Sequence, residues 1–355
     1  MEGHPNQAVR FCRAPDGTRI AYAVHGHGPP LLVSTCWLSH LQHDWESPVW
    51  QHFLRDLGRI ATVVRYDERG HGLSDRDVTD FSLDARIGDL EAVADDAGLD
   101  KFALMAMAQG GPPSIHYAVR HPERLSRLIF YSSTACLVPD PTPGDRELED
   151  VVQQMIRVGY GRDDSTFRRV FTSMMIPEGS EVQMRWLDDL IRHACTADLA
   201  YEFRRQAAYI DARPLLGDVT VPTLVLHCTQ EKVLVFDQGR QLAAAIPGAR
   251  FVALDSPNHI VLGDEPAWQV VVDEVDRFLA QDRQGPVVPG ADILSARERE
   301  VLELAADGLG NDEISTRLHL SVRTVERHLQ NSYNKLGVSG RSARAAAVSR
   351  MLSAR

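Results

Sequence analysis

The stretch ALMAMAQGG at residues 103–111 limits the folds open to this chain more than any other segment. Its first part is a short apolar run, typical of a buried strand, and its two glycines permit a tight turn. Pro112 and Pro113 follow, and proline is tolerated in the first turn of a helix because its missing N–H group costs little there. The segment therefore predicts a buried strand that turns sharply into a helix.

Strand and helix patterns alternate on both sides of this turn. Short apolar runs bounded by turn residues predict strands, and apolar residues three or four positions apart predict helices. The strands are expected at residues 9–13, 18–24, 31–35, 60–66, 102–107, 127–132, 223–228 and 250–254. The main helices are expected at residues 48–57, 82–97 and 266–279. Such alternation predicts an α/β fold with a largely parallel sheet and right-handed crossovers.

Residues 139–213 break this alternation, because their pattern is helical and contains no clear strand. The segment is rich in methionine and aromatic residues and lies between two predicted strands. An insertion at that point covers the carboxyl edge of a parallel sheet, where ligands bind in open α/β folds. We therefore expect a helical lid. Its apolar side chains either line a pocket or form the lid's own core, and the sequence supports both uses.

A second domain is expected near the C-terminus. The sequence QDRQGPVVPG at residues 281–290 is rich in proline and glycine, which is typical of a linker. The expected division is a first domain at residues 1–280, a linker at 281–291 and a second domain at 292–355. No internal repeat is evident in either part.

The second domain has the pattern of a small helical module. Ser295 and Glu298 form a capping-box pattern at the start of a helix. A short helix at 312–318 and a longer basic helix at 322–336 follow, the latter preceded by the capping residue Ser321. A short helix, a tight turn and a longer helix predict an all-α helix-turn-helix domain.

Charge is distributed unevenly along the chain. The formal net charge is −11, but residues 314–355 contain eight Lys or Arg residues and one acidic residue. An acidic body with a basic C-terminal segment indicates a polyanion as the partner of that segment. Charge alone also fits an ordinary solvated helix surface.

The cysteine pattern and the apolar runs indicate the compartment. The five cysteines are odd in number, widely spaced and without a C-x-x-C pair, which favours free thiols in a reducing environment. Residues 1–13 lack the apolar core of a secretion signal, and no run of about 18 apolar residues occurs. We therefore expect a cytoplasmic protein without a membrane partner, a metal or a cofactor.

Residues 9–280 resemble the α/β-hydrolase fold. The turn at Ala108 has the shape of that fold's nucleophile elbow, G-x-S-x-G, and the loop YDERGHGLSD at 66–75 resembles the family's loop after the fourth strand. Glu231 and His259 fall in the loops that carry the acid and the histidine of the family's catalytic triad. Their order along the chain is also that of the family.

The resemblance implies a role for each of these residues. His259 would be the base, and Glu231 would hold its imidazole in the required tautomer. Trp37 and Gln109 would supply the backbone N–H groups of an oxyanion hole.

This chain departs from the family pattern at the residue on which the chemistry depends. Ala108 stands at the position of the nucleophilic serine, and a methyl group cannot attack a carbonyl. Ala106 replaces the first glycine of the elbow, and Thr35-Cys36 replaces the usual His-Gly. The explanations that stay open are a ligand sensor without turnover, an engineered alanine that traps a bound ester or lactone, and slow hydrolysis by water that His259 activates.

The second domain resembles the DNA-binding domain of LuxR-type regulators over residues 292–355. The residues in register with that family are REREVL at 297–302, Gly308, Asn311, Glu313, Ile314, Ser321, Thr324, Val325, His328 and KLGV at 335–338. In such modules the recognition helix lies in the major groove of double-stranded DNA.

The resemblance also implies which side chains of this helix meet DNA. The positions that match the family's base-facing residues are Glu326, Arg327 and Gln330. The candidates for contacts with phosphate groups are Arg323, Thr324, Lys335 and Arg341. The residues expected to face the domain's core are Val325, Leu329 and Leu336.

Together the two resemblances predict a ligand-responsive transcription regulator of the LuxR class. Its first domain is expected to bind a small apolar ester, lactone or ketone, without turnover because residue 108 is alanine. A homodimer is expected, because such DNA-binding modules read paired half-sites. The alternatives are a serine esterase or lactone hydrolase fused to a DNA-binding domain, with its serine replaced by Ala108, and a DNA-binding protein whose hydrolase-like part serves only assembly.

Overall fold

The computed structural model describes residues 7–34, 38–138, 142–280, 296–306, 308–318 and 320–335, together with 338, 344, 347 and 348. The chain divides into two compact units, residues 1–279 and residues 280–355. Each unit has a hydrophobic core of its own.

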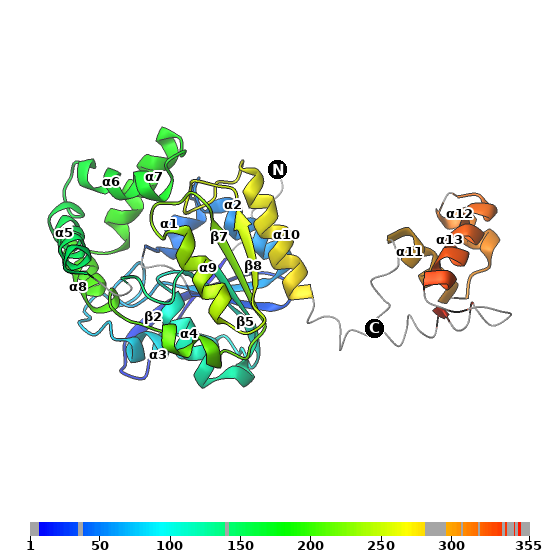
Figure 1. Cartoon of the computed structure of the whole chain (residues 1–355), viewed down its shortest axis with the longest axis horizontal. Helices are drawn as coiled ribbons and strands as arrows, with labels where there is room; N and C mark the ends of the chain where they lie inside the picture. The colour runs from blue at the N-terminus through cyan, green and yellow to red at the C-terminus, as the bar shows by residue number, and fades with distance from the viewer. Residues whose placement is uncertain are drawn as a thin grey trace. The chain divides into compact units, whose positions relative to one another are not determined.

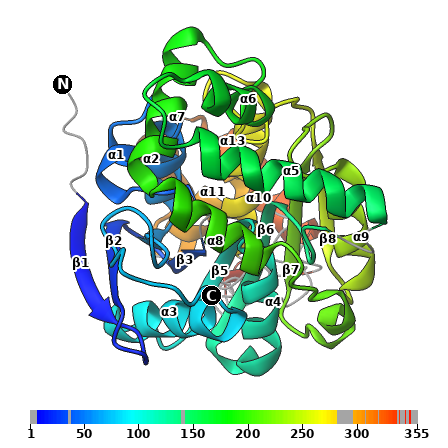
Figure 2. The same ribbon diagram turned by 90° about the vertical axis from the view of Figure 1, so that its left-hand side faces the viewer.

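The first unit is built on an eight-stranded sheet with the strand order β1-β2-β4-β3-β5-β6-β7-β8. Its strands are β1 (Ala8–Arg13), β2 (Arg19–Gly26), β3 (Pro30–Ser34), β4 (Thr62–Tyr66), β5 (Phe102–Ala108), β6 (Leu125–Ser133), β7 (Thr223–Cys228) and β8 (Arg250–Leu254). Strands β1 and β2 form an antiparallel hairpin, β2 pairs antiparallel with β4, and the other neighbours are parallel. The predicted α/β fold is confirmed, and Figures 1 and 2 show it from two sides.

Helices cover both faces of the sheet. The helices outside the lid are α1 (Leu41–Trp45), α2 (Gln51–Ile60), α3 (Leu83–Asp96), α4 (Gly111–Arg120), α9 (Phe236–Ala245) and α10 (Pro266–Ala280). Alternate residues of β5 join different cores: Ala103 and Met105 pack in the core that includes α2 and α10, while Leu104 and Ala106 pack with α3, α4 and α9. Because both faces of β5 are buried, its sequence is a continuous apolar run.

The expected lid is present as helices α5 (Pro143–Gly159), α6 (Thr166–Met175), α7 (Glu181–Ala194) and α8 (Ala197–Ala207) between β6 and β7. Side chains from α5, α7 and α8 form a local core that includes Ile156, Ile191 and Phe203. Leu187 and Leu190 of α7 instead join the core on the α2 and α10 side of the sheet. The lid therefore has a core of its own and also packs on the core of the sheet.

Most expected element boundaries agree with the structure to within a few residues. Ser82 caps α3 as expected, since its hydroxyl accepts from the N–H of Ala85. The expected strand at 60–66 starts later, at Thr62, because Ile60 completes the last turn of α2. The N–H of Ala61 still donates to the carbonyl of Leu57, so the strand begins only after this helical bond.

The second unit contains α11 (Ala296–Ala306), α12 (Asn311–Leu318) and α13 (Val322–Lys335). Val301, Ile314, Val325 and Leu329 are buried together in its core, which confirms the inward-facing positions expected for α13. Ser321 caps α13, since its hydroxyl accepts from the N–H of Thr324 at 3.1 Å.

Several expectations for this end of the chain fall outside the described residues. They concern the linker at 281–291, the capping residue Ser295 and the core position Leu336. Among the helices that the structure describes, none is long and apolar enough to cross a membrane.

Candidate functional site

Residue 108 lies in a strained turn between β5 and α4. Ala108 has a φ of 43°, in the left-handed region that residues other than glycine and asparagine rarely adopt. The register between β5 and β6 shifts between Met107 and Ala108, which is where the chain leaves the sheet. A non-glycine residue held in such a conformation costs on the order of 1–3 kcal/mol. The sharp turn expected from the sequence is therefore present, with an alanine at its tip.

Gly110 and Gly111 allow the start of α4 to approach the neighbouring strands closely. A Cβ atom on Gly110 would lie 2.7 Å from the carbonyl oxygen of Ser34, and one on Gly111 would overlap the carbonyl oxygen of Thr134. These oxygens belong to backbone at the ends of β3 and β6, so they cannot move away cheaply. The glycine pair is thus a packing requirement of the turn.

Arg86 of α3 connects this turn to the loop that follows β4. Its guanidinium donates to the carboxylate of Glu68 at 2.9 Å and to the backbone carbonyl of Gln109 at 3.1 Å. Both charged side chains are buried, with 2% of each exposed. The loop at residues 66–75, which follows β4, therefore supports the backbone beside Ala108.

His259 and Glu231 lie side by side in the folded chain. Glu231 follows β7 and His259 follows β8, and these strands are parallel neighbours whose carboxyl ends lie together. The Nδ1 atom of His259 is 2.5 Å from the Oε2 atom of Glu231, and both residues are buried. Burial opposes ionisation of Glu231, but the imidazoles of His259 and His227 outweigh it and lower the pKa of the carboxyl group.

Further contacts fix the carboxylate of Glu231. The N–H of Leu234 donates to Oε2 at 3.2 Å, and the Nε2 atom of His227 lies 3.1 Å from Oε1. His227 is fully buried near the end of β7, and burial lowers its pKa. We did not expect this residue from the sequence, where it appears only as part of an apolar strand.

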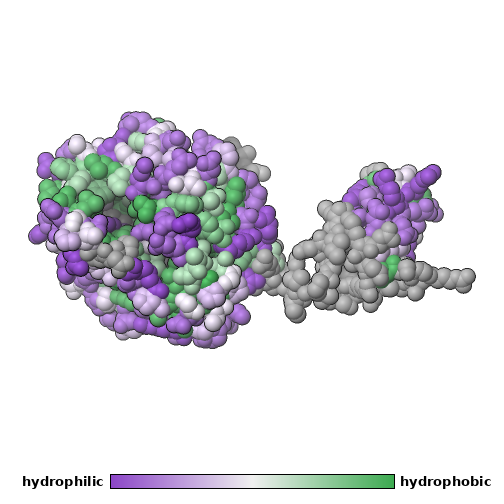
Figure 3. All heavy atoms as spheres, viewed as in Figure 1, coloured by the Kyte–Doolittle hydropathy of each residue, from purple (hydrophilic) through white to green (hydrophobic). Residues whose placement is uncertain are grey.

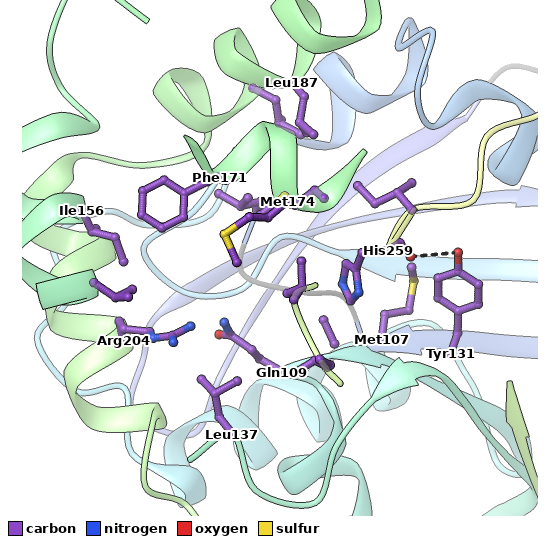
Figure 4. Close-up of a pocket in the computed structure, with 18 of the residues that line it drawn as sticks. Met107, Gln109, Tyr131, Leu137, Ile156, Phe171, Met174, Leu187, Arg204 and His259 are labelled. Carbon is purple, nitrogen blue, oxygen red and sulfur yellow. Dashed lines mark hydrogen bonds between the residues drawn. The ribbon is translucent and has the colours of Figure 1, made fainter. Parts of the chain in front are cut away.

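Tyr131 of β6 fixes the backbone that carries His259. Its hydroxyl donates to the carbonyl of His259 at 3.2 Å and accepts from the N–H of Val261 at 2.9 Å. Burial raises the pKa of Tyr131 well above its ordinary value, so the hydroxyl keeps its proton. Figure 4 shows the first of these bonds beside the His259 ring.

An apolar cavity of about 140 Å³ connects the turn, the histidine and the lid. Ala108, Gln109 and His259 lie in its wall. Its lid side is lined by Val152, Ile156, Phe171, Met174, Met175, Leu187, Leu190 and Arg204. Figure 4 shows Ile156, Phe171, Met174 and Arg204 around one space, and Figure 3 shows a hollow bordered by apolar residues on the lid side of the first unit.

Polar side chains are few in this wall, and one of them was not expected from the sequence. Arg204 of α8 points toward Gln109 across the cavity (Figure 4). Its guanidinium is held by paired bonds of 2.7 Å to the buried carboxylate of Glu149 on α5. The helical spacing of the lid gave no reason to separate Arg204 from the lid's many exposed arginines.

The structure thus places three of the expected site residues around one cavity, with Glu231 behind His259. Trp37, and with it the segment Thr35-Cys36, lies outside the described residues. Among the residues that are described, no three His, Cys, Asp or Glu side chains are placed to hold a metal ion.

The recognition helix expected from the sequence is α13. Its exposed residues include Arg323, Glu326, Arg327 and Gln330. Thr324 is partly buried, and its hydroxyl pairs with that of Ser321 at 2.7 Å in the cap of the helix. The Lys335 side chain and all of Arg341 lie outside what the structure describes.

Comparison with known families matches both parts of the chain. Residues 292–348 match the luxR family of bacterial regulatory proteins. Residues 46–266 match the family described as serine aminopeptidase, S33. The second match covers more than half of the chain and includes Ala108, Glu231 and His259.

Individual proteins resemble the first unit. The chain is 25% identical to a pimeloyl-[acyl-carrier protein] methyl ester esterase of Nitrosomonas europaea, over 66% of this chain and 90% of that protein. A hydrolase from Pseudomonas aeruginosa superposes with a TM-score of 0.64 at 24% identity, covering 76% of this chain and 98% of its own. An enol-lactonase from Burkholderia xenovorans gives a TM-score of 0.56 at 24% identity, covering 76% and 100%. These structural likenesses show the fold.

Proposed function

Since the chain belongs to the serine aminopeptidase S33 family of α/β-hydrolases and ends in a DNA-binding domain of the luxR family, we propose that it is a ligand-responsive transcription regulator. Its first unit binds a small apolar ester, lactone or ketone and does not turn it over. The ligand controls how the second unit engages DNA.

The observation that carries this proposal is an alanine at the tip of a turn that keeps the strained shape of a nucleophile elbow. Ala108 keeps the strained left-handed φ of 43° and lines the cavity with His259, but its methyl group cannot attack a carbonyl. The strain has no use in nucleophilic catalysis here. It is retained because the turn shapes one wall of a ligand site.

The cavity wall sets the chemistry and the size of the ligand. Its lining is mainly apolar, and its polar groups are concentrated at His259, Gln109 and Arg204. A cavity of about 150 Å³ holds a benzene-sized molecule, and the present one measures about 140 Å³. A compact molecule with a single carbonyl group therefore fits best. The names of the similar esterase and enol-lactonase agree with an ester or lactone carbonyl.

The lid and the second unit supply the response. Lid residues line the cavity, so a bound ligand changes the packing of α5, α6 and α7. Ligand affinity and DNA affinity are then linked through the conformations that the ligand favours. The protein acts as a homodimer in the cytoplasm, with paired copies of α13 reading two half-sites of double-stranded DNA.

On α13, base contacts are assigned to Glu326, Arg327 and Gln330. Arginine pairs well with guanine and glutamine with adenine in the major groove. Arg323, Thr324, Lys335 and Arg341 are assigned to phosphate groups, which fix the register of the helix on DNA.

Replacement of Ala108 by serine tests the proposal. The Ala108→Ser protein and the unchanged protein are assayed on short acyl esters and lactones, and DNA affinity is measured with and without each compound. We expect a compound that changes the DNA affinity of the unchanged protein without being consumed. Rapid turnover of that same compound by the unchanged protein would overturn the sensor function.

A second candidate function is hydrolysis, and the preserved His259–Glu231 pair is the observation that favours it. In that case Ala108→Ser restores fast turnover, and DNA affinity does not depend on the substrate. Removing a triad serine leaves only a weak residual rate from the other groups, so the two outcomes are easily distinguished.

A further inference from the structure

The first unit holds a histidine and a carboxylate paired as in a general base, but residue 108 offers no nucleophile for them to activate. His259 lines the cavity, and Glu231 holds its Nδ1 atom at 2.5 Å. We propose that this pair moves protons on the ligand itself: His259 removes a proton from the carbon next to the carbonyl of a bound ketone and returns it. The protein then catalyses exchange of this α-proton through an enolate of its ligand, an activity that rests on the ligand site proposed above.

The contacts of Glu231 decide which nitrogen of His259 is the base. The ionised carboxylate only accepts hydrogen bonds, so the proton of the neutral imidazole must lie on Nδ1, which faces Oε2. The lone pair is then on Nε2, the other nitrogen of a ring that lines the cavity. The N–H of Leu234 donates to the same Oε2 atom, so a second contact holds this oxygen in place beside Nδ1 of His259.

The part of the wall beside Ala108 is suited to the oxygen of an enolate. Gln109 lines the cavity and immediately precedes the N-terminal end of α4, a helix of ten residues. The partial positive charge of a helix N-terminus stabilises an anion. Negative charge that develops on the carbonyl oxygen therefore faces a favourable field, as required for removal of a proton from the neighbouring carbon.

The size and polarity of the cavity favour this step over attack by water. Hydrolysis by activated water needs a water molecule beside the carbonyl carbon as well as the ligand. The cavity measures about 140 Å³ and is mainly apolar, so a ligand that fills it leaves no polar space for water. Removal of a C–H proton needs only the ligand and His259.

The proposed step is balanced without a further reactant. The C–H bond next to the carbonyl breaks, its electron pair forms the C=C bond of the enolate, and the C=O π electrons move to oxygen. Nε2 of His259 takes the proton and later returns it to the same carbon. Between these events the imidazolium proton can exchange with solvent, so the reaction leaves a label in heavy water.

Deuterium incorporation tests this activity. The full-length protein is mixed in D₂O with cyclopentanone, cyclohexanone or γ-butyrolactone, chosen for their compact size. Binding is measured by calorimetry, and loss of the α-proton signal is followed by ¹H NMR. We expect exchange of a bound ketone at least about 100-fold faster than in buffer, since a positioned general base contributes about 10²–10⁴ in rate.

The controls separate the base from the fold. His259→Gln should remove the acceleration, and Glu231→Gln should strongly reduce it, because an amide can stabilise the wrong tautomer. His193→Gln removes an exposed histidine of α7 and should leave exchange unchanged. Unchanged calorimetric binding by the first two variants shows that the site is still formed.

The possible outcomes are distinct. Binding of a ketone without exchange that depends on His259 overturns this inference and leaves the proposed sensor function intact. Conversion of γ-butyrolactone to its hydroxy acid without ketone exchange also overturns it, because His259 then activates water. Binding of none of the compounds overturns the proposed ligand class, and this inference with it.

Discussion

The two units of this chain carry their chemistry in opposite places. The first unit holds its candidate site inside, where Arg86, Glu231 and His259 are buried with partners. The second unit carries its candidate site outside, on the exposed face of α13, while its buried residues form an apolar core. A buried site depends on every residue that supports it, whereas an exposed helix depends on only a few contacts for its shape.

This difference predicts how each unit responds to substitution. In the first unit a change far from the cavity can destroy the fold, because buried charges need their partners. In the second unit a change on the outer face of α13 should alter binding and leave the fold intact. All five tryptophans lie between residues 37 and 268, so tryptophan fluorescence reports on the first unit alone.

The largest change in the free energy of unfolding of the first unit is expected from Arg69→Met. Arg69 is 1% exposed and donates to the carboxylate of Asp89 at 2.7 Å, and Asp89 is equally buried. Removing the guanidinium leaves a buried charge without its partner, which costs about 3–5 kcal/mol. Urea unfolding followed by tryptophan fluorescence measures the loss.

The matched control is Arg205→Met, which breaks an exposed ion pair with Glu202 and should cost about 0–1 kcal/mol. Far-UV circular dichroism should still show the helices of the second unit after the first has unfolded in Arg69→Met. Simultaneous loss of both would show that the units do not fold independently.

The next effect is a pH dependence confined to the first unit. His25 is buried against the carbonyl of Leu54, and burial lowers its pKa to about 4. An unfolded chain binds the proton at about 6.5, so the stabilisation is present above that pH and is lost as pH falls toward 4. Protonation of this residue in the unfolded chain should lower the free energy of unfolding at pH 5 by about 2 kcal/mol relative to pH 7.

Comparison of His25→Gln with the unchanged protein isolates this residue from the other titrating groups. The difference in unfolding free energy between pH 7 and pH 5 should be smaller in His25→Gln by that amount. His193→Gln, at an exposed position, should keep the original difference. An identical pH dependence in His25→Gln would show that His25 does not carry the effect.

The contrast between a buried site and an exposed helix also explains which features could be predicted from the sequence. Val325 and Leu329 of α13 were assigned to the core from the resemblance of residues 292–355 to LuxR-type domains, and both are buried. The strands and the turn at Ala108 were also predictable, because apolar runs and glycines act locally. The pairing of His259 with Glu231 was inferred from the order of loops in a known fold.

What the sequence did not predict depends on contacts between distant segments. Arg204 enters the cavity wall because α8 packs against α5 and pairs with Glu149. His227 meets Glu231 because a strand end and the following loop fold back on each other. Neither residue stands out by spacing or composition, since each is one of many similar residues in its segment.

A smaller effect is expected from Arg327→Ala, which tests the exposed site of the second unit. Loss of the proposed base contact should weaken binding to the preferred DNA site by about 1–3 kcal/mol and relax the preference at one base pair. The measurement is a titration of full-length protein on a site selected in vitro by the unchanged protein, at fixed salt concentration.

Arg205→Ala is the control for charge, since it removes the same charge from α8 of the first unit. Equal weakening by both substitutions would indicate a general electrostatic effect and remove Arg327 from the base contacts. Tryptophan fluorescence should show the same unfolding curve for Arg327→Ala as for the unchanged protein.

The smallest effect, and the only stabilising one, is expected from Ala108→Gly. Glycine adopts a φ of 43° without the steric strain of a Cβ atom, but it also increases the freedom of the unfolded chain. The strain energy relieved at Ala108 is larger than the entropic cost, so the free energy of unfolding in urea should rise by about 0.5–1 kcal/mol.

Ala106→Gly is the matched substitution two residues earlier, within β5, and should destabilise the unit because no backbone strain is relieved there. If both changes destabilise equally, the turn at residue 108 stores no strain, and the argument that it is kept to shape a ligand site fails.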